Sequence, residues 1–143
     1  MKNLVGIFLM FIVVQPLSAQ ISEFSAEKKS AVVDNLTVAI KSDNAGLQTS
    51  GALVLSNLIS DAYLLNNDAS SAMIPLLKML KEGKTDEERI AAAVALYQLG
   101  NSIGIYSIRG VAVYDDNEKV ATVCKNLYYS YHKLHGTEYL VTY

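Results

Sequence analysis

Few side chains in this sequence carry chemistry of their own, and their spacing limits what they could do. Cys124 is the single cysteine, so no disulfide can form within the chain. It falls on an apolar stripe, which favours a buried side chain over an exposed catalytic thiol. His132 and His135 are the two histidines, and a pair of imidazoles supplies too few ligands for a stable metal site. We therefore expect no catalytic residue, no metal site and no cofactor.

Acidic residues are the other candidates for chemistry. They gather in two groups of three, at Asp86, Glu87 and Glu88 and at Asp115, Asp116 and Glu118. Each group stands where we expect a helix to begin, and the positive end of the helix dipole stabilises carboxylates there. Helix starts therefore explain both groups without a bound cation or an acid–base pair. The sequence also lacks a glycine-rich phosphate loop, a GxSxG motif and an HExxH motif, so it gives no basis for an enzyme.

The elements that position these residues are centred on residues 72–100, which predict two helices joined by a short polar loop. The apolar residues of each helix recur at the spacing of a single helix face; they are Met73, Leu76, Leu77 and Leu80, then Ala92, Ala95, Leu96 and Leu99. We expect Ser71 to cap the first helix. Thr85 and Glu88 have the spacing of a capping box, and Gly100 stands where a left-handed C-terminal cap is common. With so short a link, the two helices must lie antiparallel.

An imperfect copy of this pair lies on each side of it. In the first copy, a helix over about 25–41, capped by Ser25, is followed by a turn at 42–46 and a second helix. The last copy, over 101–131, contains Asp115 and Glu118 at the spacing of another capping box. Residues 62–65 predict an extra helical turn between the first and middle pairs. The expected stripes of these copies are Gly51, Val54, Leu55 and Leu58; Ile103, Ile105, Ile108 and Ala112; and Val120, Val123, Cys124, Leu127 and Tyr131. Three such pairs predict an all-α stack, since no pair buries both of its faces alone.

The middle pair resembles a known family of repeats. Its Ile-Pro-Leu-Leu run at 74–77, the acidic turn and alanine-rich helix at 85–96, and the Leu-Gly end at 99–100 are similar to a HEAT-type repeat of the short kind also found in bilin-lyase-like proteins. The resemblance implies an α–α superhelix, a short HEAT-like solenoid of about three helix pairs. Gln48 stands where the family pattern has an arginine, so the first copy departs from the Asp–Arg tie that is usual inside the turn. The usual role of the family is to bind other proteins, and some members are lyases or lyase helpers.

The chain begins with the pattern of a secretory signal. Residues 1–19 contain Lys2, an apolar run over 4–14 and small residues that end at Ala19. We expect cleavage after Ala19 and a periplasmic or secreted protein with no stable membrane span. An uncleaved anchor is the alternative, although the apolar run is short for a membrane span. The remaining chain divides into a HEAT-like repeat domain at 20–131 and a C-terminal tail at 132–143.

The charge of the chain argues against a nucleic-acid partner. Without Lys2 it has 11 basic and 14 acidic side chains, a formal charge of −3, and no basic stripe appears. Another protein is therefore the expected partner. We interpret the chain as a non-enzymatic protein-binding or scaffold module of the cell envelope. The alternative, which follows from the resemblance alone, is an accessory or lyase-like enzyme component that acts on a bound small molecule or chromophore protein.

The distribution of tyrosines is the feature of the sequence that best indicates a binding surface. The chain has 9 tyrosines, most of them in its last third. A tyrosine ring is large and has a polar tip, which suits an interface, although the same rings could pack the ends of the repeats. The adjacent Tyr128 and Tyr129 must point in different directions, so at least one should leave the core. We expect the partner-binding residues on the second helices of the repeats, at Gln98, Asn101, Lys125, Tyr128 and Tyr129.

The two ends of a three-pair stack expose helix flanks, and neither flank is clearly polar. We expect the tail to fold back on the last pair through Tyr139, Leu140 and Val141. The alternative is a homodimer in which two copies associate through these exposed ends.

Overall fold

The computed structural model describes residues 25–136, and this part of the chain is helical and contains no strand. Its six α-helices are α1 (Ala26–Ile40), α2 (Ala45–Ser60), α3 (Met73–Glu82), α4 (Asp86–Leu99), α5 (Ser102–Tyr114) and α6 (Glu118–Leu134). The predicted all-α class is confirmed. The signal segment at 1–19 and the tail residues Tyr139, Leu140 and Val141 lie outside the described residues. Helix α6 continues to Leu134, into the segment that we assigned to the tail.

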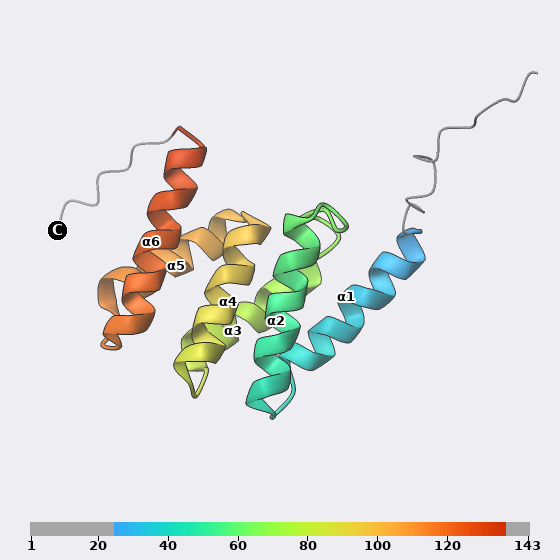
Figure 1. Ribbon diagram of the computed structural model, residues 1–143, viewed down its shortest axis with the longest axis horizontal. Helices are drawn as coiled ribbons and strands as arrows, with labels where there is room; N and C mark the ends of the chain where they lie inside the picture. The colour runs from blue at the N-terminus through green and yellow to red at the C-terminus, as the bar shows by residue number, and fades with distance from the viewer. Residues whose placement is uncertain (1–24, 137–143) are drawn as a thin grey trace, which may run out of the picture.

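The helices pack as neighbours along the chain, α1 on α2, α3 on α4 and α5 on α6. Helix α4 also packs against both α2 and α6. As a result α2, α4 and α6 lie side by side in one layer, with α3 and α5 behind it and α1 beside α2 (Figure 1). We call the side of this layer that faces away from the core the second-helix face.

Both ends of α4 form as the sequence predicts. The Thr85 hydroxyl accepts a hydrogen bond from the Glu88 N–H at 3.2 Å, and a Glu88 carboxylate oxygen accepts one from the Thr85 N–H at 2.8 Å. This capping box fixes the start of α4. Gly100 ends the helix with a φ of 59°, in the left-handed region that glycine adopts without strain. The predicted cap at Ser25 is also present, and its hydroxyl accepts from the Lys28 N–H.

The predicted start of α3 was wrong. A short 3-10 turn at Ser70–Ala72 leads into the helix, so Ser71 lies within that turn and does not cap α3. The extra helical turn predicted at 62–65 was wrong as well. Ala62 has a φ of 60°, and a residue in that left-handed conformation ends a right-handed helix, so the chain forms turns there instead.

The predicted capping box at Asp115 and Glu118 does not form. Helix α6 begins one residue after Asn117, whose side-chain oxygen accepts from the Val120 N–H at 3.1 Å. Asp115 instead accepts from the Asn117 N–H and pairs with Arg89 of the middle pair. A partner 26 residues away in the sequence therefore takes the carboxylate that local spacing had assigned to the helix start.

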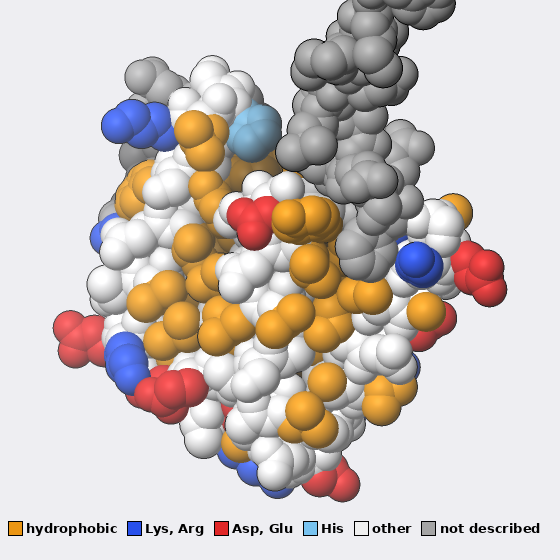
Figure 2. Space-filling model, turned by 45° about the vertical axis from the view of Figure 1, so that its right-hand side comes forward, with side chains coloured by type: hydrophobic (Ala, Val, Ile, Leu, Met, Phe, Trp, Pro, Cys, Tyr) orange, Lys and Arg blue, Asp and Glu red, His pale blue; other side chains and the backbone are white. Residues whose placement is uncertain are grey.

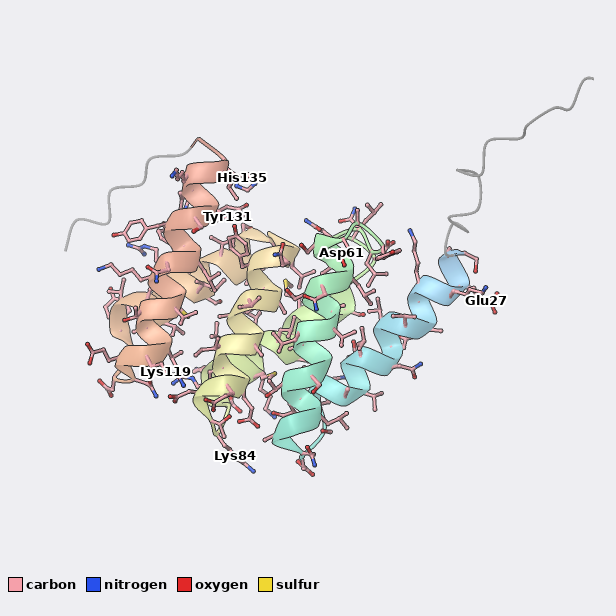
Figure 3. All side chains as sticks on the ribbon, viewed as in Figure 1. Glu27, Asp61, Lys84, Lys119, Tyr131 and His135 are labelled. Carbon is pink, nitrogen blue, oxygen red and sulfur yellow. The ribbon has the colours of Figure 1, made fainter. Side chains whose placement is uncertain are left out.

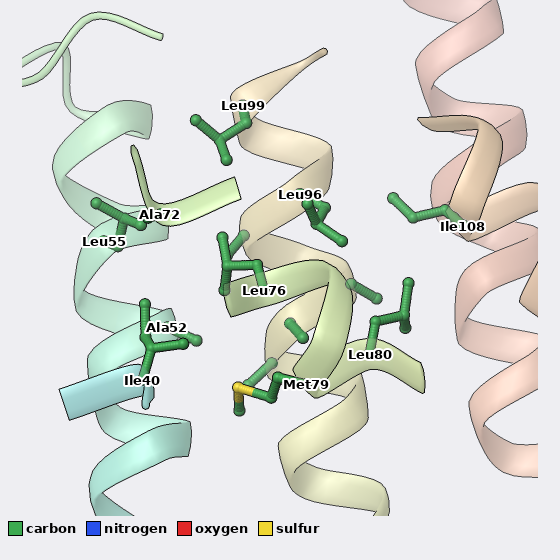
Figure 4. Packing of buried hydrophobic residues seen from close by; sticks show 14 of the residues in the cluster. Ile40, Ala52, Leu55, Ala72, Leu76, Met79, Leu80, Leu96, Leu99 and Ile108 are labelled. Carbon is green, nitrogen blue, oxygen red and sulfur yellow. The ribbon is translucent and has the colours of Figure 1, made fainter. Parts of the chain in front are cut away.

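The core runs continuously through all three helix pairs (Figure 4). Its largest fully buried side chains come from α1 to α6 and are Leu55, Leu76, Leu80, Leu96, Ile108, Val33, Val120 and Cys124. The alanines of α4 are buried as well, and their small side chains let the four neighbouring helices α2, α3, α5 and α6 approach α4 closely. Close approach also explains Gly51, where an added Cβ would lie 3.0 Å from the Ala39 Cβ of α1.

Candidate functional site

The predicted binding residues divide into exposed and buried ones. Gln98 on α4 and Lys125 on α6 are partly exposed, and Tyr129 is 42% exposed one turn after Lys125. Asn101 is exposed, but its side-chain oxygen accepts from the Ile103 N–H at 2.9 Å and so caps α5. Gln98, Lys125 and Tyr129 therefore belong to the second-helix face, while Asn101 has a structural role at its edge.

Tyr128 was predicted to lie on the binding surface, but it is buried. It is 8% exposed, because it lies one turn after the buried Cys124 on the same side of α6. Its ring packs edge-on against His132, with ring centroids 4.3 Å apart. The expected divergence of the two adjacent tyrosines is observed, since Tyr129 points away from the core. Tyr128 therefore cannot present its ring to a partner and is left out of the site.

Other aromatic rings hold the end of α6 in place. The Tyr131 hydroxyl donates a hydrogen bond to the Gly100 carbonyl at 3.2 Å, and the Tyr131 ring stacks on His135 with centroids 4.1 Å apart. Tyr97 of α4 meets Tyr131 edge-on at 6.4 Å. Figure 3 shows Tyr131 and His135 at this end of α6 and Lys119 at the other. Part of the tyrosine excess therefore packs the end of the last pair.

Neither candidate for catalysis is placed to react. Cys124 is fully buried, and burial raises the pKa of its thiol to about 12, so the nucleophilic thiolate is absent near neutral pH. Burial, and then the neighbouring His135, lower the pKa of His132, which favours its neutral form. Within residues 25–136, no group of three or more His, Cys, Asp or Glu side chains could hold a metal ion.

Three of the acidic residues, Asp86, Glu87 and Asp115, form ion pairs between the middle and last pairs. Arg89 donates from Nε to the Leu80 carbonyl at 2.9 Å and from Nη1 to Asp115 at 3.1 Å, with a second guanidinium bond to the same carboxylate. The Lys119 ammonium lies 3.0 Å from a Glu87 oxygen and 3.5 Å from an Asp86 oxygen. These carboxylates therefore hold the middle and last pairs together. The hydrogen bond from Arg89 also lowers the pKa of Asp115.

The most distinctive surface is an uncharged apolar area on the second-helix face. Helix α2 contains no Asp, Glu, Lys or Arg, and neither does the chain from 90 to 108. Leu53 and Val54 are 41% and 45% exposed on α2. Val94 and Tyr97 are partly exposed on α4. Figure 2 shows hydrophobic side chains gathered across this side of the molecule, with charged side chains mostly toward its margins.

The sequence pattern missed this area because it counted Val54 with the buried stripe of α2. That stripe is centred instead on Ala52, Leu55 and Ile59, and Val54 lies on the opposite side of the helix. The sequence nevertheless contained a sign of this exposed apolar area, because residues 45–60 have apolar side chains around the whole helix and no charged side chain. An apolar residue on both sides of a helix indicates either complete burial or a second, external contact.

A groove of about 680 Å³ lies on another part of the surface, between the turn after α1 and helix α3. Its apolar lining includes Ile40, Ile74 and Met79, and lysines and carboxylates both lie along it. Neither Cys124 nor His132 is part of this lining. No helix in the described part of the chain combines the length and the apolar character that a membrane crossing requires.

Comparison with models of known protein families, with curated proteins and with solved structures finds no match to this chain. The candidate site is therefore defined by its own geometry.

Proposed function

We propose that this protein is a non-enzymatic protein-binding or scaffold module, built as a short α-solenoid of HEAT-like repeats and exported to the cell envelope. The observation that carries this proposal is the uncharged apolar area on the second-helix face, centred on Leu53, Val54, Val94 and Tyr97. Exposed apolar side chains gathered over two adjacent helices are typical of surfaces that bind other proteins. Lys125, Gln98 and Tyr129 add polar and aromatic groups at the side of this area, as in the rim of an interface.

Two further features support the HEAT-like part of the proposal. The three helix pairs lie in chain order, and their second helices share one layer (Figure 1). Arg89 joins the turn of its own pair to that of the next by bonding to both Leu80 and Asp115. The Asp–Arg tie that the resemblance implies lies inside a single turn, whereas Arg89 pairs with Asp115 of the following pair. In the first pair, Gln48 at the corresponding position donates a hydrogen bond to the Ser42 carbonyl and stays within its own turn.

The proposal is tested by placing a photo-reactive amino acid at Leu53 or at Val38. Val38 is the matched control because it is an exposed apolar residue on α1, outside the second-helix face. Irradiation is carried out in the source cells, and the products are separated by mass. We expect a discrete cross-linked protein from position 53 that is absent from position 38. Equal products from both positions would show that this face has no special affinity.

A second variant separates loss of binding from loss of folding. The Leu53→Asp/Val54→Asp double variant places two charges in the uncharged area, where a partner would have to bury them without compensation. We expect capture of the same partner to fail while the helical circular dichroism and melting temperature stay close to those of a Val38→Asp variant. Undiminished capture by a well-folded double variant would place the binding surface elsewhere.

The alternative function, an accessory component acting on a small molecule, draws support from one observation. The groove between the turn after α1 and α3 has a volume of about 680 Å³, within the range of small-molecule sites. Since Cys124 and His132 do not line it, such a role would be binding or presentation of the molecule to another protein. Saturable binding of a chromophore that Met79→Trp abolishes and Leu53→Asp leaves intact would favour this alternative over the first.

A further inference from the structure

Helix α5 leaves a row of apolar side chains uncovered on its outer side. Ile103 and Tyr106 are 55% and 71% exposed, and Tyr114 is more exposed still. The sequence pattern assigned Ile103 to the buried stripe, but α5 is buried instead through Gly104, Ile105 and Ile108. We call Ile103, Tyr106 and Tyr114 the α5 outer row. They lie on a different helix layer from the second-helix face, so the proposed partner does not account for them.

The end of α6 lies next to the start of this row. Helices α5 and α6 are joined by a short turn and pack along each other, so the end of α6 meets the start of α5. The hydrogen bond from Tyr131 to the Gly100 carbonyl fixes this arrangement, because Gly100 precedes α5 by one residue. Tyr131 lies about one turn before the end of α6, so the chain leaves α6 on the side of the molecule where α5 begins.

The next residues, 137–143, have the length and the composition to cover the row. Their sequence is Thr-Glu-Tyr-Leu-Val-Thr-Tyr, with four apolar or aromatic side chains and one charge. Seven extended residues reach roughly 23 Å at about 3.3 Å each. Helix α5 has 13 residues and so is about 20 Å long. A strand-like segment of this length can run beside the helix from its first turn toward its last.

We propose that residues 137–143 dock along α5 and cover the α5 outer row, with Tyr139, Leu140 and Val141 against Ile103 and Tyr106. Docking within one chain is favoured over a contact between two copies because the attachment at Gly136 holds the segment at a high effective concentration beside α5.

The test uses disulfide formation in the full chain. Tyr106→Cys and Leu140→Cys are combined in one variant, and Asn126→Cys and Leu140→Cys in a control. Asn126 is exposed on α6 and lies ten residues, or about 15 Å, before Gly136, within the reach of the same segment. Native Cys124 is buried with its pKa raised, so it does not compete for the new thiols.

We expect the 106–140 disulfide to form within one chain about tenfold faster than the 126–140 disulfide, because docking raises the local thiol concentration. Equal rates would show that the segment has no preference for α5 and would overturn the proposal. Disulfide-linked dimers whose yield rises with protein concentration would also overturn it, by showing that a second copy covers the row. Binding at the second-helix face is expected to be unaffected in the Tyr106→Cys/Leu140→Cys variant, which changes no residue of that face, so the two proposals fail independently.

Discussion

Replacement of Arg89 by alanine is the most direct test of how the middle and last pairs are held together. The guanidinium makes three hydrogen bonds, one to the Leu80 carbonyl and two to the Asp115 carboxylate. The side chains of Arg89 and Asp115 are only 14% and 16% exposed, so water can only partly replace the hydrogen bonds that Arg89→Ala removes. In Arg89→Ala the Leu80 carbonyl, near the C-terminal end of α3, also loses its side-chain partner.

We expect Arg89→Ala to lower the free energy of unfolding by about 2–4 kcal/mol, because a hydrogen bond to a charged group contributes about 1.5–3 kcal/mol and partial exposure reduces the sum. Arg89→Lys keeps the positive charge but cannot bind the carboxylate in bidentate fashion, so its free energy of unfolding should lie between those of Arg89→Ala and the wild type. The assay is urea unfolding followed by circular dichroism. A double-mutant cycle with Asp115→Asn isolates the Arg89–Asp115 contribution. A loss below about 0.5 kcal/mol, the range of an exposed ion pair, would refute the reasoning.

The same pair predicts a dependence on pH. Arg89 holds the pKa of Asp115 below its ordinary value of 3.8, so the folded state binds a proton at Asp115 less readily than the unfolded state. The stabilisation from this pair is complete above pH 3.8 and is lost as the pH falls through the lower pKa of the folded state. Acid unfolding of the Arg89→Ala variant should lack this contribution. An identical acid-dependent loss of stability in both proteins would show that other carboxylates are responsible.

Four more predictions follow from packing and accessibility. Gly51→Ala should lower the free energy of unfolding by about 1–3 kcal/mol, because the added methyl group overpacks α1 against α2. Gly110→Ala should raise it by about 0.5–1 kcal/mol in the same urea titrations, because the new Cβ would meet no atom within 4 Å. Leu96→Ala should lower the free energy of unfolding by about 2–5 kcal/mol because Leu96 is fully buried, and a loss below about 1 kcal/mol would contradict that packing. Cys124 should resist Ellman's reagent until the chain unfolds, and rapid labelling of native protein would contradict its burial. Intact-mass analysis of the protein recovered from its source cells should show a chain beginning at Gln20; retention of residues 1–19 would contradict the signal assignment.

Local spacing predicted those features of the fold that depend on neighbouring residues. Thr85 and Glu88 form the expected capping box because both partners lie within one helical turn. The stripes of α3 and α4 were also predicted correctly, since Leu76, Leu80 and Leu96 recur at helical spacing and are buried. These features need no knowledge of distant parts of the chain.

The failures involve partners distant in the sequence or small rotations of a helix. Asp115 was assigned to a helix start, but Arg89 of another pair binds it and Asn117 caps α6 instead. Tyr128 and Tyr129 were both assigned to the surface, and their one-residue difference decides which is buried. Val54 was assigned to the core for a similar reason. Helical periodicity defines a stripe to within about one residue, whereas exposure of a binding residue depends on that single residue.

The two contacts of α4 within its layer differ in chemical character, and this has a consequence for temperature. Between the middle and last pairs, Arg89, Lys119 and Tyr131 make directional polar contacts. Where α4 packs on α2, the buried residues of α2 include Ala52, Leu55 and Ile59. Hydrophobic contacts weaken on cooling, whereas the hydrogen bonds from Arg89 and Tyr131 do not depend on that driving force. Hydrogen exchange near 0 °C should therefore increase first in α1 and α2, so that cold loosens the first pair while the other two remain joined.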